Sequence, residues 1–253
     1  MAIETSWDSP GRARSFVLVV SSEPKSLIFT SMMVQRLGYN TCSALGVDNA
    51  LEIATATPPA IVITELHLKG RGGLELLDLL RQNAATRATP VVIVVREPTP
   101  EVEQQCRRAG AAAVLDKPLK INSLYQVIHP LLDPESRRSH LRIKTRLPVR
   151  LNDRPLDCVH GECATNLSVN GMYLRTRQAY PENARVMVHI LLNEEQIAAE
   201  ARVVRCFPHE DGHPGMWGIG LQFLATSPES GEIIRTFIHN EVTHGMDPPQ
   251  EDY

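Results

Sequence analysis

Hydrophobic residues in the first half of the chain form short runs that alternate with stretches of helical spacing. The runs are rich in β-branched residues, as is usual for strands buried on both faces of a sheet. The predicted strands cover residues 16–20, 40–44, 61–63, 91–95 and 113–115. The predicted helices cover residues 27–37, 50–56, 74–81, 100–109 and 123–132. This alternation predicts an α/β fold, with a doubly wound parallel five-stranded sheet covered by helices on both faces.

The second half has a different pattern, in which short apolar or alternating runs are separated by turn signals. The predicted strands cover residues 147–151, 157–163, 171–176, 185–191, 197–207 and 217–224. Asn170-Gly171 is one of the turn signals between them. Residues 229–242 then show helical spacing. The pattern predicts a small antiparallel β-barrel with a C-terminal helix.

The composition fits a globular protein of two domains. The chain has 253 residues, of which 43% are hydrophobic and 22% charged, so each domain can have an ordinary core. No apolar run approaches the roughly 18–20 residues that cross a bilayer, and residues 1–14 lack the apolar centre of a signal peptide. The five cysteines form no C-x-x-C pair, which argues against a disulfide framework or a zinc site. We therefore expect a cytoplasmic protein without membrane insertion.

Positive charge is concentrated in one segment of an otherwise slightly acidic chain. The net charge of −3 argues against binding to a nucleic acid polymer through bulk charge. Residues 134–154, however, contain six arginines and one lysine against two acidic residues. Because the planar guanidinium group of arginine matches phosphate and similar anions, this segment predicts a site for a small anion.

Residues 15–132 resemble a response-regulator receiver domain. The segments that carry the resemblance are, in order, Val19 to Pro24, Pro59 to Glu65, Pro90 to Val95 and Gly110 to Pro118. In receivers these segments supply the acidic pair that holds Mg²⁺, the phosphorylated aspartate, a Ser/Thr switch residue and a phosphate-binding lysine. The resemblance therefore implies the receiver fold for this half of the chain.

Several positions depart from what the receiver resemblance implies. Ser21 and Ser22 replace the acidic pair, and hydroxyls are poor ligands for Mg²⁺. Glu65 replaces the acceptor aspartate, and its extra methylene moves the carboxylate out of the in-line position. Val95 replaces the switch hydroxyl, whereas Lys117 is retained. We expect a degenerate receiver without a role in phosphorelay.

Two interpretations of Glu65 and Lys117 remain open at this point. The pair could imitate a phosphorylated aspartate and fix one conformation, or both residues could be exposed at strand ends with a weak ion pair or none. In either case we expect this domain to make protein contacts. The alternatives are a homodimer face, which by resemblance involves residues 100–132, and docking against the second half of the chain. An unknown protein target is also expected to bind through this domain.

Two short motifs in the second half resemble the signatures of the PilZ domain, which binds cyclic di-GMP. Arg138 and Arg142 fit the R-x-x-x-R signature. Asn166, Ser168 and Gly171 fit the D/N-x-S-x-x-G signature. Residues 218–223 match the closing strand that is typical of this family. Arg142 and Arg146 form a rival R-x-x-x-R pair, but Arg138 and Arg142 have the usual distance to the strand that follows.

The chemistry of these residues suits cyclic di-GMP, which has two phosphates and two guanines. The arginines can bind phosphate oxygens or the guanine O6 and N7 atoms. Asn166 and Ser168, two apart on a strand, are expected on one face, where they can hydrogen-bond a guanine edge. Gly171 is expected to adopt a positive φ and to allow close approach of the backbone. In this family a basic residue at the position of Arg137 accompanies an intercalated dimer of the ligand.

The sequence thus predicts a non-enzymatic effector, because no nucleophile–base pair is evident. No cofactor is expected, and the ligand is cyclic di-GMP. His209 and His213 lie in a loop without two further ligands, so no metal site is expected. The alternatives are a nucleotide-independent PilZ adaptor and a phosphorylation-controlled regulator. The expected boundaries are a receiver-like domain at 15–132, an arginine-rich linker at 133–142, a PilZ domain at 137–243 and a disordered tail at 244–253.

Overall fold

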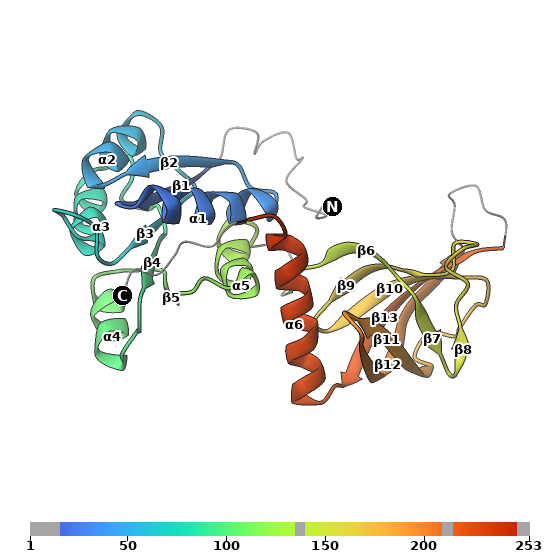
Figure 1. The fold of residues 1–253 in the computed structure, drawn as a ribbon. Coiled ribbons are helices and arrows are strands. Elements are labelled where there is room, and N and C mark those ends of the chain that lie inside the picture. The colour runs from blue at the N-terminus through green and yellow to red at the C-terminus, as the bar shows by residue number, and fades with distance from the viewer. Residues whose placement is uncertain (1–15, 135–139, 209–214, 247–253) are drawn as a thin grey trace. The chain divides into compact units, whose positions relative to one another are not determined.

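The computed structural model describes residues 16–134, 140–208 and 215–246 (Figure 1). These residues form two compact units, one containing residues 16–134 and the other residues 140–242. Residues 135–139 of the linker expected at 133–142, and residues 247–253 of the tail expected at 244–253, lie outside the described residues. Within the described ranges, no helix is long and apolar enough to span a membrane.

The first unit is a parallel sheet with the strand order β2-β1-β3-β4-β5. Its strands are β1 (Val17–Ser21), β2 (Thr41–Leu45), β3 (Ile61–Glu65), β4 (Val91–Val95) and β5 (Ala113–Asp116). Its helices are α1 (Pro24–Arg36), α2 (Val47–Ala56), α3 (Gly73–Gln82), α4 (Pro100–Arg108) and α5 (Ile121–Leu132). This arrangement confirms the α/β fold expected from the apolar runs.

The three central strands explain why those runs are continuous rather than alternating. Every residue of β1 and β4 is buried, because helices cover both faces of the sheet. The edge strand β2 buries only Ala44. The carboxyl ends of β1, β3 and β5 meet at one edge, where ligands bind in sheets of this kind. That edge places Ser21, Glu65 and Lys117 near one another.

The second unit is an eight-stranded antiparallel sheet in the order β6-β9-β10-β13-β12-β11-β7-β8. Its strands are β6 (Ile143–Leu147), β7 (Val149–Leu151), β8 (Arg154–Pro155), β9 (Ala164–Ser168), β10 (Gly171–Thr176), β11 (Arg185–Leu192), β12 (Glu195–Pro208) and β13 (Trp217–Ala225). The helix α6 (Pro228–Thr243) follows the last strand. A curled antiparallel sheet with a C-terminal helix confirms the expected fold of this half.

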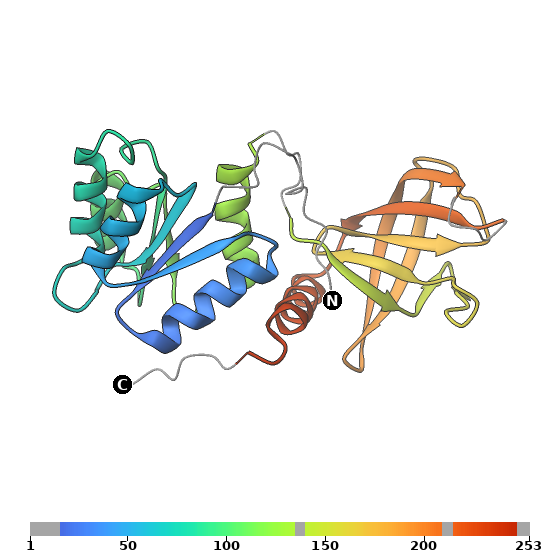
Figure 2. The same cartoon turned by 90° about the horizontal axis from the view of Figure 1, so that it is seen from above.

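The sheet curls because two strands that are adjacent in the sequence, β6 and β7, lie near its opposite ends (Figure 2). Strands β6 and β7 are separated only by Pro148, yet β6 pairs with β9 and β7 pairs with β11. Proline has no N–H to donate to a ladder, so the pairing can change partner there. Alternate residues of β11 face the interior, among them Val188 and Ile190.

The strand expected at 157–163 is wrong, because these residues form a turn before β9 begins at Ala164. The Asp157 carboxylate accepts hydrogen bonds from the backbone N–H groups of Val159 and His160 at 3.1 and 3.2 Å. It also contacts the His160 ring at 2.6 Å, and Gly161 has a φ of 91°. Such local bonds from a side chain to the backbone compete with a strand ladder.

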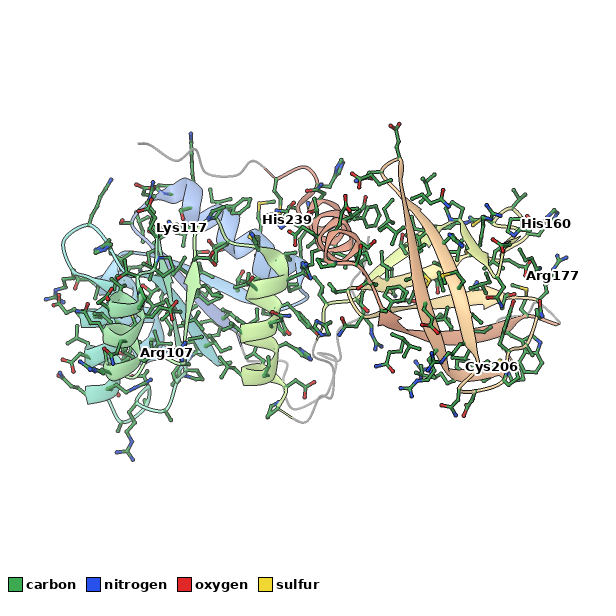
Figure 3. All side chains as sticks on the ribbon, turned by 90° about the horizontal axis from the view of Figure 1, so that it is seen from below. Arg107, Lys117, His160, Arg177, Cys206 and His239 are labelled. Carbon is green, nitrogen blue, oxygen red and sulfur yellow. The ribbon has the colours of Figure 1, made fainter. Side chains whose placement is uncertain are left out.

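A buried carboxylate ties this turn to the sheet. Glu162 is 3% exposed, and both of its carboxylate oxygens accept from Arg154 Nη2, at 2.7 and 3.0 Å. The Thr176 hydroxyl and the Arg177 backbone N–H donate to it as well, at 3.0 and 2.8 Å. Figure 3 shows Arg177 and the turn residue His160 at the end of this unit away from α6. Burial raises the pKa of Glu162, but these hydrogen bonds and the charge of Arg154 outweigh it and lower the pKa below its usual value.

We expect Glu162→Gln to lower the free energy of unfolding of this unit by about 1–3 kcal/mol at pH 7, because a charged acceptor of several bonds is lost. A lowered folded-state pKa stabilises the fold above the unfolded-state pKa of 4.5, and this stabilisation is lost as the pH falls through the folded-state value. The difference between variant and wild type should therefore shrink below that pH. Urea unfolding followed by tryptophan fluorescence measures it.

The exposed residue Glu182 provides the control on the same unit. Its substitution, Glu182→Gln, should change the unfolding free energy by less than about 0.5 kcal/mol. Equal effects of the two variants, or a difference that does not depend on pH, would contradict the assigned role of Glu162.

Candidate functional site

The pairing of β6 with β9 brings the arginine-rich segment to a polar hairpin. In this antiparallel ladder Ile143 lies opposite Leu167 and Lys144 lies opposite Asn166. The same register, continued by one residue, places Arg142 across from Ser168. Arg142 is exposed, whereas its neighbours Leu141 and Ile143 are buried. Arg142 therefore lies on the outer face of the sheet, beside the second sequence motif.

The second motif forms the hairpin between β9 and β10. Ser168 lies opposite Gly171, so that Val169 and Asn170 make a two-residue turn. Ser168 is 6% exposed, and its hydroxyl donates to the Gly171 carbonyl oxygen at 3.0 Å. The Asn170 carbonyl accepts from the Phe223 N–H at 2.9 Å, which attaches the turn to β13. The hairpin is thus held in shape by its own polar groups.

Gly171 has a different role from the one expected. The predicted positive φ is wrong, because Gly171 does not have a positive φ. Instead, a Cβ at this position would collide with the carbonyl oxygen of Leu221 on β13. Gly171 is therefore required by the close approach of two neighbouring backbones.

The structure brings four of the six predicted nucleotide-site residues together at one edge of the sheet: Arg142, Asn166, Ser168 and Gly171. Asn166 is half-buried, and its side-chain carbonyl accepts from the Thr165 hydroxyl at 3.1 Å. Arg137 and Arg138 lie outside the described residues. The rival residue Arg146 instead donates to the Cys158 carbonyl oxygen at 2.7 Å.

The first unit has a second polar cluster, centred on one oxygen of Glu65. Glu65 Oε1 accepts from Ser21 Oγ at 2.9 Å, from Ser26 Oγ at 2.7 Å and from Lys117 Nζ at 2.9 Å. Ser21 and Ser26 are 2% and 3% exposed. The ion pair is therefore sheltered, which decides against the expectation of two exposed residues with little or no contact.

Ser26 was not predicted as part of this cluster. It lies in the first turn of α1, and its hydroxyl reaches back to the end of β3. The signal in the sequence was the break at Ser22-Glu23-Pro24, which begins a helix directly after a buried strand. Of the other predicted residues, Ser22 is partly exposed and Val95 is buried at the end of β4.

The space beside Glu65 is very small. A cavity of about 10 Å³ lies between Ser21, Thr30, Glu65 and Lys117. A volume of that size holds about one water molecule. Among the described residues, no group of three or more His, Cys, Asp and Glu residues is placed to hold a metal ion.

Family comparisons assign both halves of the chain. Residues 17–129 match the response regulator receiver domain, and residues 136–240 match the PilZ domain. The chain carries a receiver domain followed by a PilZ domain.

Individual proteins are similar to about half of the chain. The sensory/regulatory protein RpfC of Xanthomonas campestris pv. campestris is 32% identical over 126 residues, which are 47% of this chain and 17% of that protein. The protein PilH of Pseudomonas aeruginosa is 24% identical over 116 residues, which are 46% of this chain and 96% of that protein. A solved structure of the chemotaxis protein CheY4 of Vibrio cholerae is 24% identical, covers 47% of this chain and 100% of its own, and has a TM-score of 0.45.

We expect Gly171→Ala to destabilise the PilZ domain by about 1–3 kcal/mol, because the new methyl group forces β10 and β13 apart. Urea unfolding measures this change. Gly231→Ala is the matched control in the same domain: Gly231 lies inside α6, where the nearest atoms to a new Cβ are 3.6 Å away. That change should stabilise the domain by about 0.5–1 kcal/mol. A neutral Gly171→Ala variant would refute the backbone contact as the reason for this glycine.

Proposed function

We propose that the chain is a non-enzymatic receptor for cyclic di-GMP, with the nucleotide bound on the outer face of the PilZ domain. The observation that carries the proposal is the β6–β9 register, which places Arg142 beside the hairpin that contains Asn166, Ser168 and Gly171. Residues from two motifs, separated in the sequence, thus share one edge of the sheet.

The chemistry of these side chains supports a guanine nucleotide with two phosphates. Arg142 is exposed and carries a guanidinium group that can donate two parallel hydrogen bonds to a phosphate or to guanine O6 and N7. Asn166 offers both a donor and an acceptor to a guanine edge. Ser168 holds the hairpin through its own donated bond, and so we assign it a positioning role. Arg137 and Arg138 supply further positive charge in the proposed site.

The arginine segment also suits a role in communication between the domains. Its first part, the linker at 133–142, follows the receiver domain directly in sequence and precedes the first PilZ strand. In the proposal, the nucleotide binds this linker and thereby changes the domain arrangement and the contacts with a protein target. By thermodynamic reciprocity, a target that prefers one arrangement changes the nucleotide affinity by the same factor.

The receiver domain acts in this proposal without phosphorylation. Three donors converge on Glu65 Oε1, so the carboxylate is already held where a receiver would bind its phosphoryl group. Lys117 is already paired with Glu65 in the absence of a phosphoryl group, which favours one fixed conformation over a switch. The domain then binds another protein through residues 100–132. This partner is either a protein target or a second copy of the chain.

Calorimetric titration should detect cyclic di-GMP binding to the full chain, and Arg142→Ala should weaken it by roughly 10- to 100-fold through the loss of charge-assisted hydrogen bonds. Arg146→Ala is the matched control. Arg146 follows Arg142 by four residues, as Arg142 follows Arg138, but it donates to the backbone carbonyl of Cys158. The control should bind within about two-fold of wild type.

Two results of this titration would overturn the proposal. A wild-type chain that does not bind the nucleotide would favour the nucleotide-independent adaptor. Equal affinity of Arg142→Ala and wild type would remove the proposed site even if the ligand binds.

Incubation with acetyl phosphate and Mg²⁺ should leave the intact mass of the chain unchanged, because Glu65 is misplaced for in-line transfer and Ser21 and Ser22 are poor Mg²⁺ ligands. A variant with Ser21→Asp, Ser22→Asp and Glu65→Asp restores the acidic set and serves as the positive control. It should gain the mass of one phosphoryl group. A stable gain of that mass by the wild type would show instead a phosphorylation-controlled regulator.

A further inference from the structure

An aromatic pair lies on the outer face of the PilZ sheet, where side chains are usually polar. Tyr173 alternates with the buried residues Met172 and Leu174 of β10, and so its side chain leaves the core. Its ring stacks with that of Phe207 on β12, with centroids 6.0 Å apart and an angle of 30° between the planes. Phe207 is 39% exposed. A pair with Tyr173 half-buried and Phe207 exposed, on the outer face of the sheet, is not explained by core packing alone.

Gly218 of β13 makes room for this pair, and Gly220 makes room for the neighbouring Arg205. A Cβ at Gly218 would collide with the Tyr173 hydroxyl group and would lie 3.1 Å from the Phe207 ring. A Cβ at Gly220 would lie 3.0 Å from Arg205 Cγ. Side chains of β10 and β12 thus lie over the β13 backbone at these two glycines.

An arginine completes the surface. The register shift between Val203 and Arg205 is a bulge, and both Val204 and Arg205 are exposed as a result. The Arg205 guanidinium carbon lies 5.8 Å from the centroid of the Phe207 ring, within the range of a cation–π contact. We call Tyr173, Phe207 and Arg205 together the aromatic platform; Figure 3 labels Cys206, which lies between two of them in β12.

The aromatic platform begins one strand away from the proposed nucleotide site. Tyr173 lies directly opposite Asn166 in the β9–β10 ladder. Neighbouring strands are about 4.8 Å apart, so a guanine whose edge is bonded to Asn166 is long enough to reach the Tyr173 ring. Purines stack on aromatic side chains and on guanidinium planes, and arginine also donates to guanine O6 and N7.

We infer that the aromatic platform is a stacking subsite for one guanine base of cyclic di-GMP. Asn166 then contacts the edge of the base, and the Tyr173 ring contacts its face. The inference rests on the proposed function, since it takes the same nucleotide at the same face of the sheet. It adds a set of binding residues that lies outside both sequence motifs.

The test compares two substitutions of Tyr173 by calorimetric titration with cyclic di-GMP. Tyr173→Leu removes the ring and should weaken binding by about 5- to 150-fold, the range that loss of one base–aromatic stack produces. Tyr173→Phe keeps the ring and should bind within about two-fold of wild type. Tyr180→Leu is the matched control, since Tyr180 is in the same domain and bonds to Gln178 through its hydroxyl.

A second readout separates stacking from a structural effect. In the bound nucleotide, the ring current of residue 173 should shift the NMR signal of one guanine H8 proton upfield. This shift should be seen with the wild type and with Tyr173→Phe. If Tyr173→Leu does not fold, Phe207→Leu takes its place, because Phe207 is exposed and its ring is the other half of the stack. This variant should also weaken binding and reduce the upfield shift.

The outcomes distinguish the inference from the proposed function. Weaker binding after Arg142→Ala together with unchanged binding after Tyr173→Leu or Phe207→Leu would overturn the stacking subsite and leave the receptor function in place. Absence of binding by the wild type would overturn both. Equal losses with Tyr173→Phe and Tyr173→Leu would also contradict stacking, because they would assign the effect to the hydroxyl group.

Discussion

The antiparallel pairing of β6 with β9 is the constraint on which the proposed site depends. It fixes Ile143 opposite Leu167, with both side chains in the core, and so it turns Arg142 and Asn166 toward the outer face. A shift of one residue would reverse every side chain of β6 and place the arginine in the core. The register that closes the sheet therefore also assembles residues from two separate motifs.

The fold of both domains could be predicted because hydrophobic patterns are local. Continuous apolar runs identified the buried strands of the receiver domain, and alternating runs identified most strands of the PilZ domain. The prediction failed at residues 157–163, where apolar residues suggested a strand but Asp157 forms a turn. The reason for a glycine at position 171 could not be predicted either. A side chain there would collide with a carbonyl oxygen on β13, fifty residues later in the chain.

For the candidate sites, only the residues that belong to short sequence motifs could be predicted. Asn166, Ser168 and Gly171 are adjacent in sequence and lie on one hairpin, whereas Arg142 joins them through a ladder. Ser26 was missed because its contact with Glu65 spans 39 residues and no pattern marks it. The aromatic platform was missed for a similar reason: its residues come from different strands, and a tyrosine in a strand usually indicates core packing.

Amide hydrogen exchange of the full chain, with and without saturating cyclic di-GMP, tests the central claim most directly. Exchange should become slower in peptides that cover Arg137 to Leu147 and in the β9–β10 hairpin, Ala164 to Thr176, because the ligand bridges these two segments. Binding that leaves the exchange of both segments unchanged, or no binding at all, would contradict it.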